Sequence, residues 1–522
     1  MSSIPFTGLF IDGEWRPAST GATFGVLNPA TGKVIGTSAS ASADDCVAAI
    51  EAAARAFKTW EHSPLPVRRD VFLRAAELLA TGKYKAKVAA ATKEELAASA
   101  DMFWMNHTVQ INHLRNFAGA IQLLKGETFP SVVPGGQVFA QRRALGVIFG
   151  IAPWNAPTGL CIRAIAIPLI CGNTVVLKSS EECPRTHAVI VELFEEAGLP
   201  KGVLNFISVS KEDVSARVSQ IIAHPSVRKI NFTGSDRVGS IIAAEAARHL
   251  KQCVLELGGK APVIVLDDAD VRRAARAITS SALLQSGQIC MSTERVIIQR
   301  AVAPALVEEL TALFGKGKAG DPGTEPSANL GPLFTEGAAE NVLAMIQEAV
   351  TQGAQVILGD LVRQGAYVQP HIVMNARPGM RLWERESFGP VVAVAVVDTV
   401  DEAVDLANAC DYSMTSAVWT KDVYRAFDVA GRIHAACANI NGPTIHVEFM
   451  RDLGGLGGAS GYGHFRVEDW TAVRMVVLHP KEEPPYILLD TLNATRNANG
   501  ATNTVNVTNG SSHLNGTSQT ID

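Results

Sequence analysis

Short apolar runs alternate with amphipathic helical patterns through the middle of this chain. Between residues 144 and 255, runs such as LGVIFGIAP, NTVVLKSS and KINFTGS are rich in β-branched residues, and segments such as RTHAVIVELFEEAG lie between them. This alternation of strands and helices predicts βαβ units and a parallel sheet. Ligands of such sheets bind beyond the carboxyl ends of the strands, so polar residues at those ends are candidates for function.

The patterns on either side of this region predict further elements. Before it, LFIDGEWRP indicates a hairpin, and Ser42 begins a helix in which Val47, Ile50, Ala54 and Phe57 recur at three- and four-residue spacing. After it, a second alternation of strands and helices runs from APVIVLDDAD to ANINGP. The chain is therefore predicted to be an α/β protein with a second α/β domain.

Residues 491–522 have a different composition. Asn, Thr, Ser and Gly dominate this segment, and large apolar residues are sparse. Because such a segment cannot bury enough apolar surface to offset the entropy of ordering, we predict a disordered tail.

Composition and charge exclude several classes of protein. The chain has 522 residues, of which 47% are hydrophobic and 19% are charged, so two or three soluble globular domains are expected. Its net charge of −5 and its lack of Lys/Arg clusters argue against nucleic-acid binding. The apolar stretches are too short to span a bilayer, and the first residues do not resemble a secretory signal. We expect no membrane association and a cytoplasmic location.

The eight cysteines are scattered along the chain, and none of them forms a CxxC pair with another. This spacing indicates neither a disulfide framework nor a zinc site. Free thiols and no bound metal are therefore predicted. Because free Cys is usually buried and inert, no cysteine stands out by residue type alone.

One literal G-x-G-x-x-G sequence, GKGKAG at Gly315–Gly320, matches the dinucleotide-binding fingerprint. That fingerprint needs a strand before it and a helix after it, whereas here the helical pattern VEELTALF precedes it and DPGTEP follows. Gly315 is therefore predicted to end a helix rather than to bind a cofactor.

Polar residues follow three of the predicted strands. Asn155 could present its side-chain amide to a developing oxyanion, although Asn is also a common turn residue. Lys178 and Glu181 lie where a ribose could bind, or they are solvated surface charges. The segment FTGSDRVG turns from a strand into a helix, whose N-terminus suits a phosphate, but plain strand-to-helix turns look similar.

Two more segments carry groups that could react. Glu256 lies between apolar residues and a double glycine, a setting in which a carboxylate can act as a base; a salt-bridged structural role is the alternative. Cys290 closes the segment SGQIC and is either a nucleophile or a small core residue. Gly287 before it permits close approach of a ligand or of another backbone segment.

Taken together, these segments resemble a known superfamily. The ordered set GVIFGIAPWNAP, GNTVVLKSSE, FTGSDRVG, LELGGKAPVIV, GQIC, ESFGPV and LGGLGGASGYG is similar to that of the aldehyde dehydrogenases, and the resemblance runs from about residue 9 to residue 480. It implies two Rossmann-like α/β domains with a small β-rich oligomerisation flap. The implied ranges are 1–124 with 144–255 for NAD binding, 256–460 for catalysis, and 125–143 with 461–485 for oligomerisation.

The resemblance also implies roles for individual residues. Cys290 matches the nucleophile, which attacks the aldehyde carbonyl as a thiolate, and Glu256 matches the base that activates water to hydrolyse the thioester. Asn155 matches the side-chain donor of the oxyanion hole, with the Cys290 backbone N–H as the second donor. The implied cofactor contacts are Ile151, Pro153, Trp154, Lys178, Glu181, Gly234, Ser235, Leu257, Gly258, Glu386 and Phe388.

Glu181 bears on the choice between NAD and NADP. A carboxylate at the adenosine ribose accepts a hydrogen bond from the 2′-OH but repels a 2′-phosphate. Lys178 beside it could tolerate a phosphate. NAD is the expected cofactor, and NADP is less favoured.

Within the superfamily, the chain is most similar to the salicylaldehyde and vanillin dehydrogenase branch, on segments such as GQICMSTERV and NINGPTIH. This similarity implies an aromatic or otherwise hydrophobic aldehyde. Arg451 and Asp452 stand where relatives commonly have Met-Pro-Phe-Gly-Gly, and a charged pair there would suit a more polar aldehyde. The substrate-pocket candidates are Phe103, Trp104, Arg163, Ile289, Met291 and Phe449. By position alone, Phe103, Trp104, Arg163 and Phe449 could as easily be core or surface residues.

Three alternatives remain open: an enzyme for a polar or aliphatic aldehyde, a CoA-acylating enzyme, and a non-catalytic binding or structural descendant. CoA-acylating relatives usually lack a glutamate at the position of Glu256, and a non-catalytic descendant would be expected to lose the thiol or the base. The resemblance also implies a homodimer or homotetramer. An apolar edge strand such as TAVRMVVLHP is otherwise an aggregation hazard.

Overall fold

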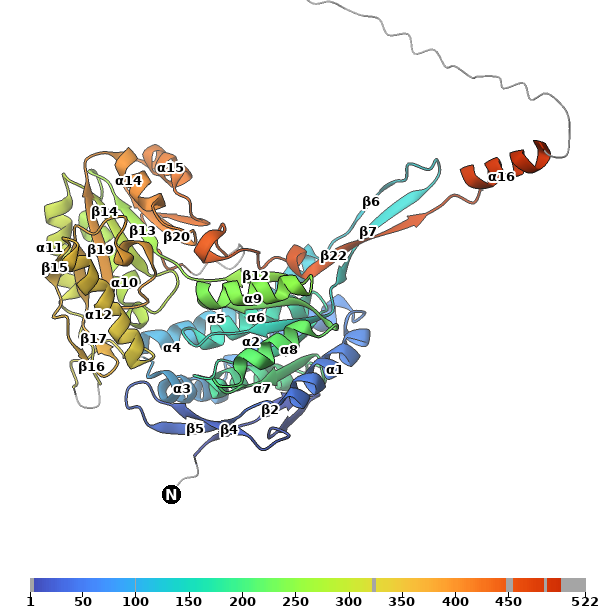
Figure 1. Ribbon diagram of the computed structural model, residues 1–522, viewed down its shortest axis with the longest axis horizontal. Coiled ribbons are helices and arrows are strands. Elements are labelled where there is room, and N and C mark those ends of the chain that lie inside the picture. Colours follow the sequence, from blue (N-terminus) through green and yellow to red (C-terminus); the bar gives the residue numbers. More distant parts are fainter. Residues whose placement is uncertain (1–3, 99, 322–324, 447–453, 483–485, 499–522) are drawn as a thin grey trace, which may run out of the picture. The chain divides into compact units, whose positions relative to one another are not determined.

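The structure is a computed structural model that describes residues 4–98, 100–321, 325–446, 454–482 and 486–498. The chain forms two units: one comprises the residues up to Lys125 together with Arg142–Val473, and the other comprises Gly126–Gln141 together with the residues from Arg474 onward. The larger unit contains two seven-stranded sheets, each covered by helices (Figure 1). None of the helices in the described ranges is long and apolar enough to cross a membrane.

The first large sheet has the strand order β12-β11-β8-β9-β10-β2-β3. The five strands from β12 to β10 are mutually parallel, as predicted. The predicted hairpin, β2 and β3, extends this sheet in antiparallel pairing. The strand bounds are β2 (Leu9–Ile11), β3 (Glu14–Arg16), β8 (Val147–Ile151), β9 (Thr174–Lys178), β10 (Leu204–Ile207), β11 (Val227–Thr233) and β12 (Gln252–Glu256).

Both faces of this sheet are buried, because successive side chains of each strand point to opposite faces. Ile148 and Val175 pack into one apolar core, whereas Phe149 and Val176 pack into another. The first core includes residues of α2 (Leu65–Leu79), α3 (Gly82–Leu96), α5 (Thr108–Gly119), α6 (Pro157–Ile170) and α7 (Pro184–Glu196). The second core includes residues of α1 (Ala43–Trp60), α8 (Val214–Ala223) and α9 (Asp236–Arg248).

Local sequence explains where two of the helices begin or end. At the start of α1, the Asp45 backbone N–H donates to Ser42 Oγ at 3.1 Å, and the Ser42 N–H donates to the Asp45 carboxylate at 3.0 Å, which completes a capping box. Helix α11 (Ala303–Phe314) ends at Gly315, as predicted. The literal glycine fingerprint therefore follows a helix and lacks the strand that a dinucleotide site requires.

The second large sheet has the strand order β15-β18-β19-β14-β13-β20-β21. All of its neighbouring strands are parallel except β15 and β18. Its strands are β13 (Ala261–Val265), β14 (Thr293–Gln299), β15 (Gln355–Leu358), β18 (His371–Met374), β19 (Val391–Val397), β20 (Thr415–Trp419) and β21 (Cys437–Ile440). Its helices include α10 (Val271–Leu283), α12 (Glu336–Thr351), α14 (Val400–Asn408) and α15 (Val423–Arg432).

The chain passes from the first sheet to the second within four residues, since β12 ends at Glu256 and β13 begins at Ala261. Two mostly parallel sheets with covering helices agree with the predicted fold class. The exact domain ranges stay predictions.

A third sheet has the order β22-β7-β6, and all three of its strands contribute residues to the smaller unit. Strand β6 (Glu127–Pro130) pairs antiparallel with β7 (Gln137–Ala144), and β22 (Thr471–Leu478) is the other neighbour of β7. The side chains of β22 after Thr471 are exposed. This sheet is the β-rich flap that the sequence predicted.

The prediction of a disordered tail from residue 491 is wrong for residues 491–498, which belong to α16 (Ile487–Ala498). The start of this helix contains Ile487, Leu488, Leu489 and Leu492, and leucine, alanine and arginine all favour helix. The polar composition of the longer segment concealed this local preference. Residues 499–522 lie outside the described residues.

Candidate functional site

A cavity of about 700 Å³ lies at the carboxyl ends of strands in the first large sheet. Its lining includes the last residues of β8, β9 and β11, and it extends to Cys290. Glu256 and Gly258 are not among the lining residues. The predicted site residues that line the cavity are Ile151, Pro153, Trp154, Asn155, Lys178, Glu181, Gly234, Ser235, Leu257, Cys290, Glu386 and Phe388.

Two glycines allow close contacts between backbone segments around Cys290. Gly287, three residues before the thiol, has a φ of +78°, and a Cβ placed on it would lie 2.1 Å from the Gly389 carbonyl oxygen. A Cβ on Gly259 would lie 1.9 Å from the Cys290 carbonyl oxygen. The expected close approach at Gly287 is therefore confirmed, and the neighbour is another backbone segment.

The thiol of Cys290 contacts the predicted base. Its Sγ donates to Glu256 Oε1 at 3.7 Å, and Glu256 is only 2% exposed at the end of β12. Burial raises the pKa of the Cys290 thiol to about 11; the Glu386 carboxylate also raises this pKa, whereas Arg163 opposes the rise. Burial of the sulfur therefore favours the thiol over the thiolate before cofactor and aldehyde bind, and the thiolate that the sequence predicted stays a prediction. Glu256 is placed to accept its proton.

Asn155 follows β8 and is held beside the chain that leads to Cys290. Its Nδ2 donates to the Gln288 carbonyl oxygen at 3.1 Å. The Gln288 side chain is itself fixed, because its Nε2 donates to the Pro332 carbonyl oxygen at 3.2 Å and its Oε1 accepts from the Phe334 N–H at 2.9 Å. The Asn155 amide has a second N–H, which is compatible with an oxyanion-hole donor.

Lys178 and Glu181 lie together at another part of the cavity. Lys178 is buried; its Nζ donates to the Ser179 carbonyl oxygen at 2.8 Å and forms an ion pair with Glu181 Oε2 at 3.3 Å. The surface-charge interpretation of Lys178 is therefore wrong. Burial raises the pKa of Glu181, but the Lys178 ammonium, a backbone hydrogen bond and the Lys211 ammonium together outweigh this effect and hold that pKa below its usual range. Glu181 is thus a carboxylate facing the cavity.

The N-terminus of α9 and the walls beside it suit a dinucleotide. Ser235 caps α9, since its side chain accepts from the Val238 N–H at 3.4 Å, and both Gly234 and Ser235 line the cavity. Helix N-termini bind phosphates through their free N–H groups. The apolar side chains of Val218 and Ile241 form walls from α8 and α9, and Ile241 is 60% exposed. Apolar walls, a phosphate-binding turn and a carboxylate fit an NAD-type cofactor.

Glu386 and Phe388 line the cavity from the segment that precedes β19. Glu386 Oε1 accepts from the Gly259 N–H at 2.9 Å, and burial together with Glu294 raises the pKa of Glu386 to about 8. Phe388 meets Trp154 edge-on at 5.9 Å, and Trp154 stacks on Phe334 at 4.5 Å between ring centroids. Phe334 was not predicted from the sequence, because no motif surrounds it and aromatic residues are common in cores.

The residues predicted to form the substrate pocket lie in several different environments. Phe103 stacks on His107 at 5.2 Å, Trp104 is 53% exposed, Ile289 is buried and Met291 is partly buried. Arg163 is buried and forms an ion pair with Glu256. None of these five lines the cavity that contains Cys290. Phe449, Arg451 and Asp452 lie outside the described residues, and the substrate role of all these positions stays a prediction.

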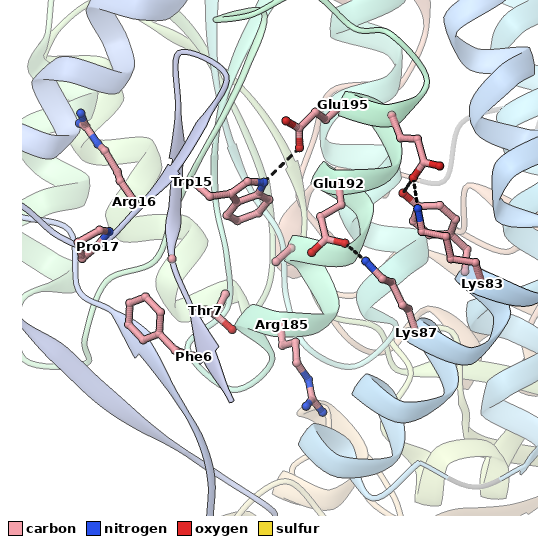
Figure 2. A pocket seen from close by; sticks show the side chains of 14 residues that line it. Phe6, Thr7, Trp15, Arg16, Pro17, Lys83, Lys87, Arg185, Glu192 and Glu195 are labelled. Atoms are coloured by element: carbon pink, nitrogen blue, oxygen red, sulfur yellow. Dashed lines mark hydrogen bonds and ion pairs between the residues drawn. The ribbon is translucent and has the colours of Figure 1, made fainter. Parts of the chain in front are cut away.

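A second cavity, of about 740 Å³, lies among β3, α3 and α7. Figure 2 shows the Trp15 indole pointing toward Glu195 and the Lys87 ammonium toward Glu192. Lys83 forms an ion pair with Glu196 at 2.6 Å. The described lining contains no cysteine and none of the predicted site residues. Its two lysines are thus each paired with a carboxylate, and the described lining offers no thiol.

Comparison with known proteins agrees with this geometry. The family model described as "Aldehyde dehydrogenase family" matches residues 15–481. The chain is 41% identical to a vanillin dehydrogenase of Pseudomonas fluorescens, over 91% of this chain and 99% of that protein. It is 37% identical to a salicylaldehyde dehydrogenase of Pseudomonas putida, over 91% of this chain and 99% of that protein.

A solved structure is similar as well. The crystal structure of a salicylaldehyde dehydrogenase from Pseudomonas putida G7, complexed with salicylaldehyde, matches 92% of this chain and 99% of that chain, with a TM-score of 0.88 and 36% identity. Other relatives include proteins named for NAD and proteins named for NADP. Similarity alone therefore leaves the choice of cofactor open.

Proposed function

The chain belongs to the aldehyde dehydrogenase family, whose members are oxidoreductases, and we propose that it oxidises an aromatic aldehyde to the carboxylic acid with NAD. The observation that carries this proposal is the contact of 3.7 Å between Cys290 Sγ and Glu256 Oε1 at a cavity that suits a dinucleotide. Similarity to the vanillin and salicylaldehyde dehydrogenases supports the aromatic substrate.

In the first half of the reaction, a bond forms between the Cys290 sulfur and the aldehyde carbon. Glu256 accepts the Cys290 proton, and the sulfur attacks the aldehyde carbon while the carbonyl π electrons move to oxygen. The Asn155 amide and the Cys290 backbone N–H hold the resulting oxyanion. A bound nicotinamide cofactor supplies the hydride acceptor. Loss of hydride from the tetrahedral carbon leaves the acyl group on Cys290 as a thioester.

The second half releases the acid. Glu256, after losing the first proton to solvent, takes a proton from water as the water oxygen attacks the thioester carbon. The bond between carbon and sulfur then breaks, and the sulfur leaves as a thiolate that recovers a proton. The presence of Glu256 next to Cys290 supports water, rather than CoA, as the acyl acceptor.

Glu181 supports NAD over NADP. It is held as a carboxylate by Lys178, and a carboxylate at the ribose repels a 2′-phosphate. Lys178 Nζ already contacts both Glu181 and the Ser179 carbonyl oxygen, so its charge is partly compensated. We expect Glu181→Ala to reduce the preference for NAD over NADP about tenfold, which corresponds to one lost charge interaction.

The proposed function is tested by an aldehyde panel. Formation of NADH and of NADPH is measured side by side with vanillin, salicylaldehyde, benzaldehyde and short aliphatic aldehydes, with and without CoA. We expect the highest kcat/KM with an aromatic aldehyde and NAD, independent of CoA. Absence of turnover with every aldehyde would refute the proposal. A strict requirement for CoA would show that CoA, rather than water, is the acyl acceptor.

The exposed apolar strand β22 supports a homodimer or homotetramer. Val473, Met475 and Leu478 are large exposed apolar side chains on this one strand, and such strands are usually covered by a partner. Light scattering on the purified protein measures the assembly. A monomer at micromolar concentration would contradict this part of the proposal.

A further inference from the structure

Helix α6 carries a single charged residue, Arg163, in the otherwise uncharged sequence PTGLCIRAIAIPLI. The Arg163 side chain is only 9% exposed. Burying an unpaired guanidinium costs several kcal/mol, so a buried arginine needs partners that compensate its charge. Its partners therefore indicate why an apolar helix carries it.

Three groups surround the guanidinium. Arg163 Nη2 forms an ion pair with Glu256 Oε2, and the same nitrogen lies 3.4 Å from Thr233 Oγ1 at the end of β11. The Phe465 ring lies 4.7 Å from the guanidinium carbon, a cation–π distance. The carboxylate, the hydroxyl and the ring together restrict the orientation of the guanidinium.

The two oxygens of Glu256 have different partners. Oε2 contacts Arg163, whereas Oε1 accepts from Cys290 Sγ at 3.7 Å. Cys290 lines the cavity and Arg163 does not. The carboxylate thus bridges a cation outside the cavity lining and the thiol within it. With one oxygen held by Arg163, the other is directed at the reacting group.

We propose that Arg163 is a positioning residue for the base: it holds Oε2 of Glu256 so that Oε1 stays directed at the Cys290 thiol and, later, at the water that attacks the thioester. This inference rests on the proposed function. Arg163 is inferred to touch neither aldehyde nor cofactor, and no bond to it forms or breaks. Burial lowers the pKa of its guanidinium to about 10, so the residue stays charged at neutral pH.

The other interpretation is that Arg163, one of the pocket candidates from the sequence, contacts the substrate. The two roles predict different kinetics, because loss of a substrate contact raises KM, whereas loss of base positioning lowers kcat. They also differ in their dependence on Glu256. A residue that acts only through Glu256 has nothing left to position once that carboxylate is removed.

The experiment is a double-mutant cycle of Arg163→Gln and Glu256→Gln in the full-length protein, with steady-state NADH formation from an aromatic aldehyde. We expect Glu256→Gln to lower kcat about 10²- to 10⁴-fold. Arg163→Gln should lower kcat at least about tenfold, with KM changed less than about twofold. The double variant should be no slower than Glu256→Gln alone, within about twofold.

Two further variants guard against a purely structural effect. Arg163→Lys keeps the charge and should recover part of the kcat lost in Arg163→Gln, because an ammonium can still hold the carboxylate but lacks the planar fork. Cys161→Ala alters a buried residue two positions away on the same helix and should leave kcat unchanged. If Arg163→Gln does not fold, the cycle is run with Arg163→Lys, which should lower kcat alone but not in the Glu256→Gln background.

The kinetic outcomes distinguish between these two roles of Arg163. A rise in KM with unchanged kcat would assign Arg163 to the substrate and overturn the inference. Losses that multiply in the double variant would show that Arg163 acts independently of Glu256, and would also overturn it. If the wild type forms no NADH, or if Glu256→Gln retains full kcat, the proposed function fails and the inference fails with it.

Discussion

Two cavities of the larger unit have nearly the same volume, about 700 and 740 Å³, but they contain different ionisable groups. In the surface cavity of Figure 2, Lys83 and Lys87 each contact a carboxylate. In the candidate site, burial raises the pKa of Cys290 to about 11 and the pKa of Glu386 to about 8. The surface cavity also contains a shifted group, since burial and Glu196 raise the pKa of Tyr84. The candidate site is therefore distinguished by a thiol in contact with a buried carboxylate, rather than by cavity size or by a shifted pKa alone.

The largest effect is expected at the nucleophile. Cys290→Ala removes the atom that bonds to the aldehyde carbon, so kcat/KM for NADH formation should fall at least about 10³-fold. Cys437→Ala, which alters another partly buried thiol outside both cavities, is the matched control and should retain wild-type turnover. Retention of more than about a tenth of the activity in Cys290→Ala would remove the thiol from the mechanism.

The next effect is expected at the oxyanion donor. Asn155→Ala removes a side-chain N–H from the developing oxyanion, and kcat should fall about 10²- to 10³-fold. The affinity for NAD, measured by titration, should change less than about twofold, because the donor acts on the reacting oxygen. A strong loss of NAD binding with little change in kcat would instead make Asn155 a structural residue of the cavity wall.

The pH dependence of alkylation tests the state of the thiol. Because the pKa of Cys290 is raised to about 11, its thiolate fraction grows with pH and is small at neutral pH. Without cofactor, iodoacetamide should modify Cys290 about 10²-fold more slowly at pH 8 than an ordinary thiol, and the rate should still rise above pH 9. Mass spectrometry of the labelled peptide gives the rate for this residue alone. A plateau below pH 8 would indicate a resting thiolate.

The smallest effect is expected in the surface cavity. Lys87→Ala removes one partner of the Lys87–Glu192 ion pair, whose two side chains are 39% and 35% exposed. Exposed ion pairs contribute about 0.2–1 kcal/mol to the free energy of unfolding, and kcat should not change. Urea unfolding and NADH formation measure the two quantities. A large loss of activity in this variant would break the distinction between the cavities.

The sequence predicted those features that depend on a local pattern of residues. The parallel strands β8, β9 and β11 and the helix cap at Ser42 lie where the hydrophobic pattern and the capping residues indicated. Most of the predicted cofactor residues line one cavity, because the carboxyl ends of parallel strands meet at one edge of the sheet. The helix at residues 487–498 was missed because composition was averaged over a longer, polar segment.

Contacts between distant segments were not predictable from pattern. Phe334 stacks on Trp154, 180 positions earlier in the chain, and nothing in the residues around it signals that contact. Arg385 and Asp236 form an ion pair between the segment before β19 and the first turn of α9. Pairings of this kind depend on the path of the whole chain, whereas periodicity reports only the local environment of each residue.

The sequence by itself determined the class of fold, the family and the residues able to react, because strand and helix periods, caps and ordered motifs are local properties of the chain. Only the tertiary structure decided the state of those residues. The partial burial of the Cys290 thiol, the contact between its sulfur and Glu256, and the pairing of Glu256 with Arg163 all arise when β12, α6 and the loop before β14 pack together. Desolvation and charge pairing depend on neighbours in space, and packing supplies those neighbours.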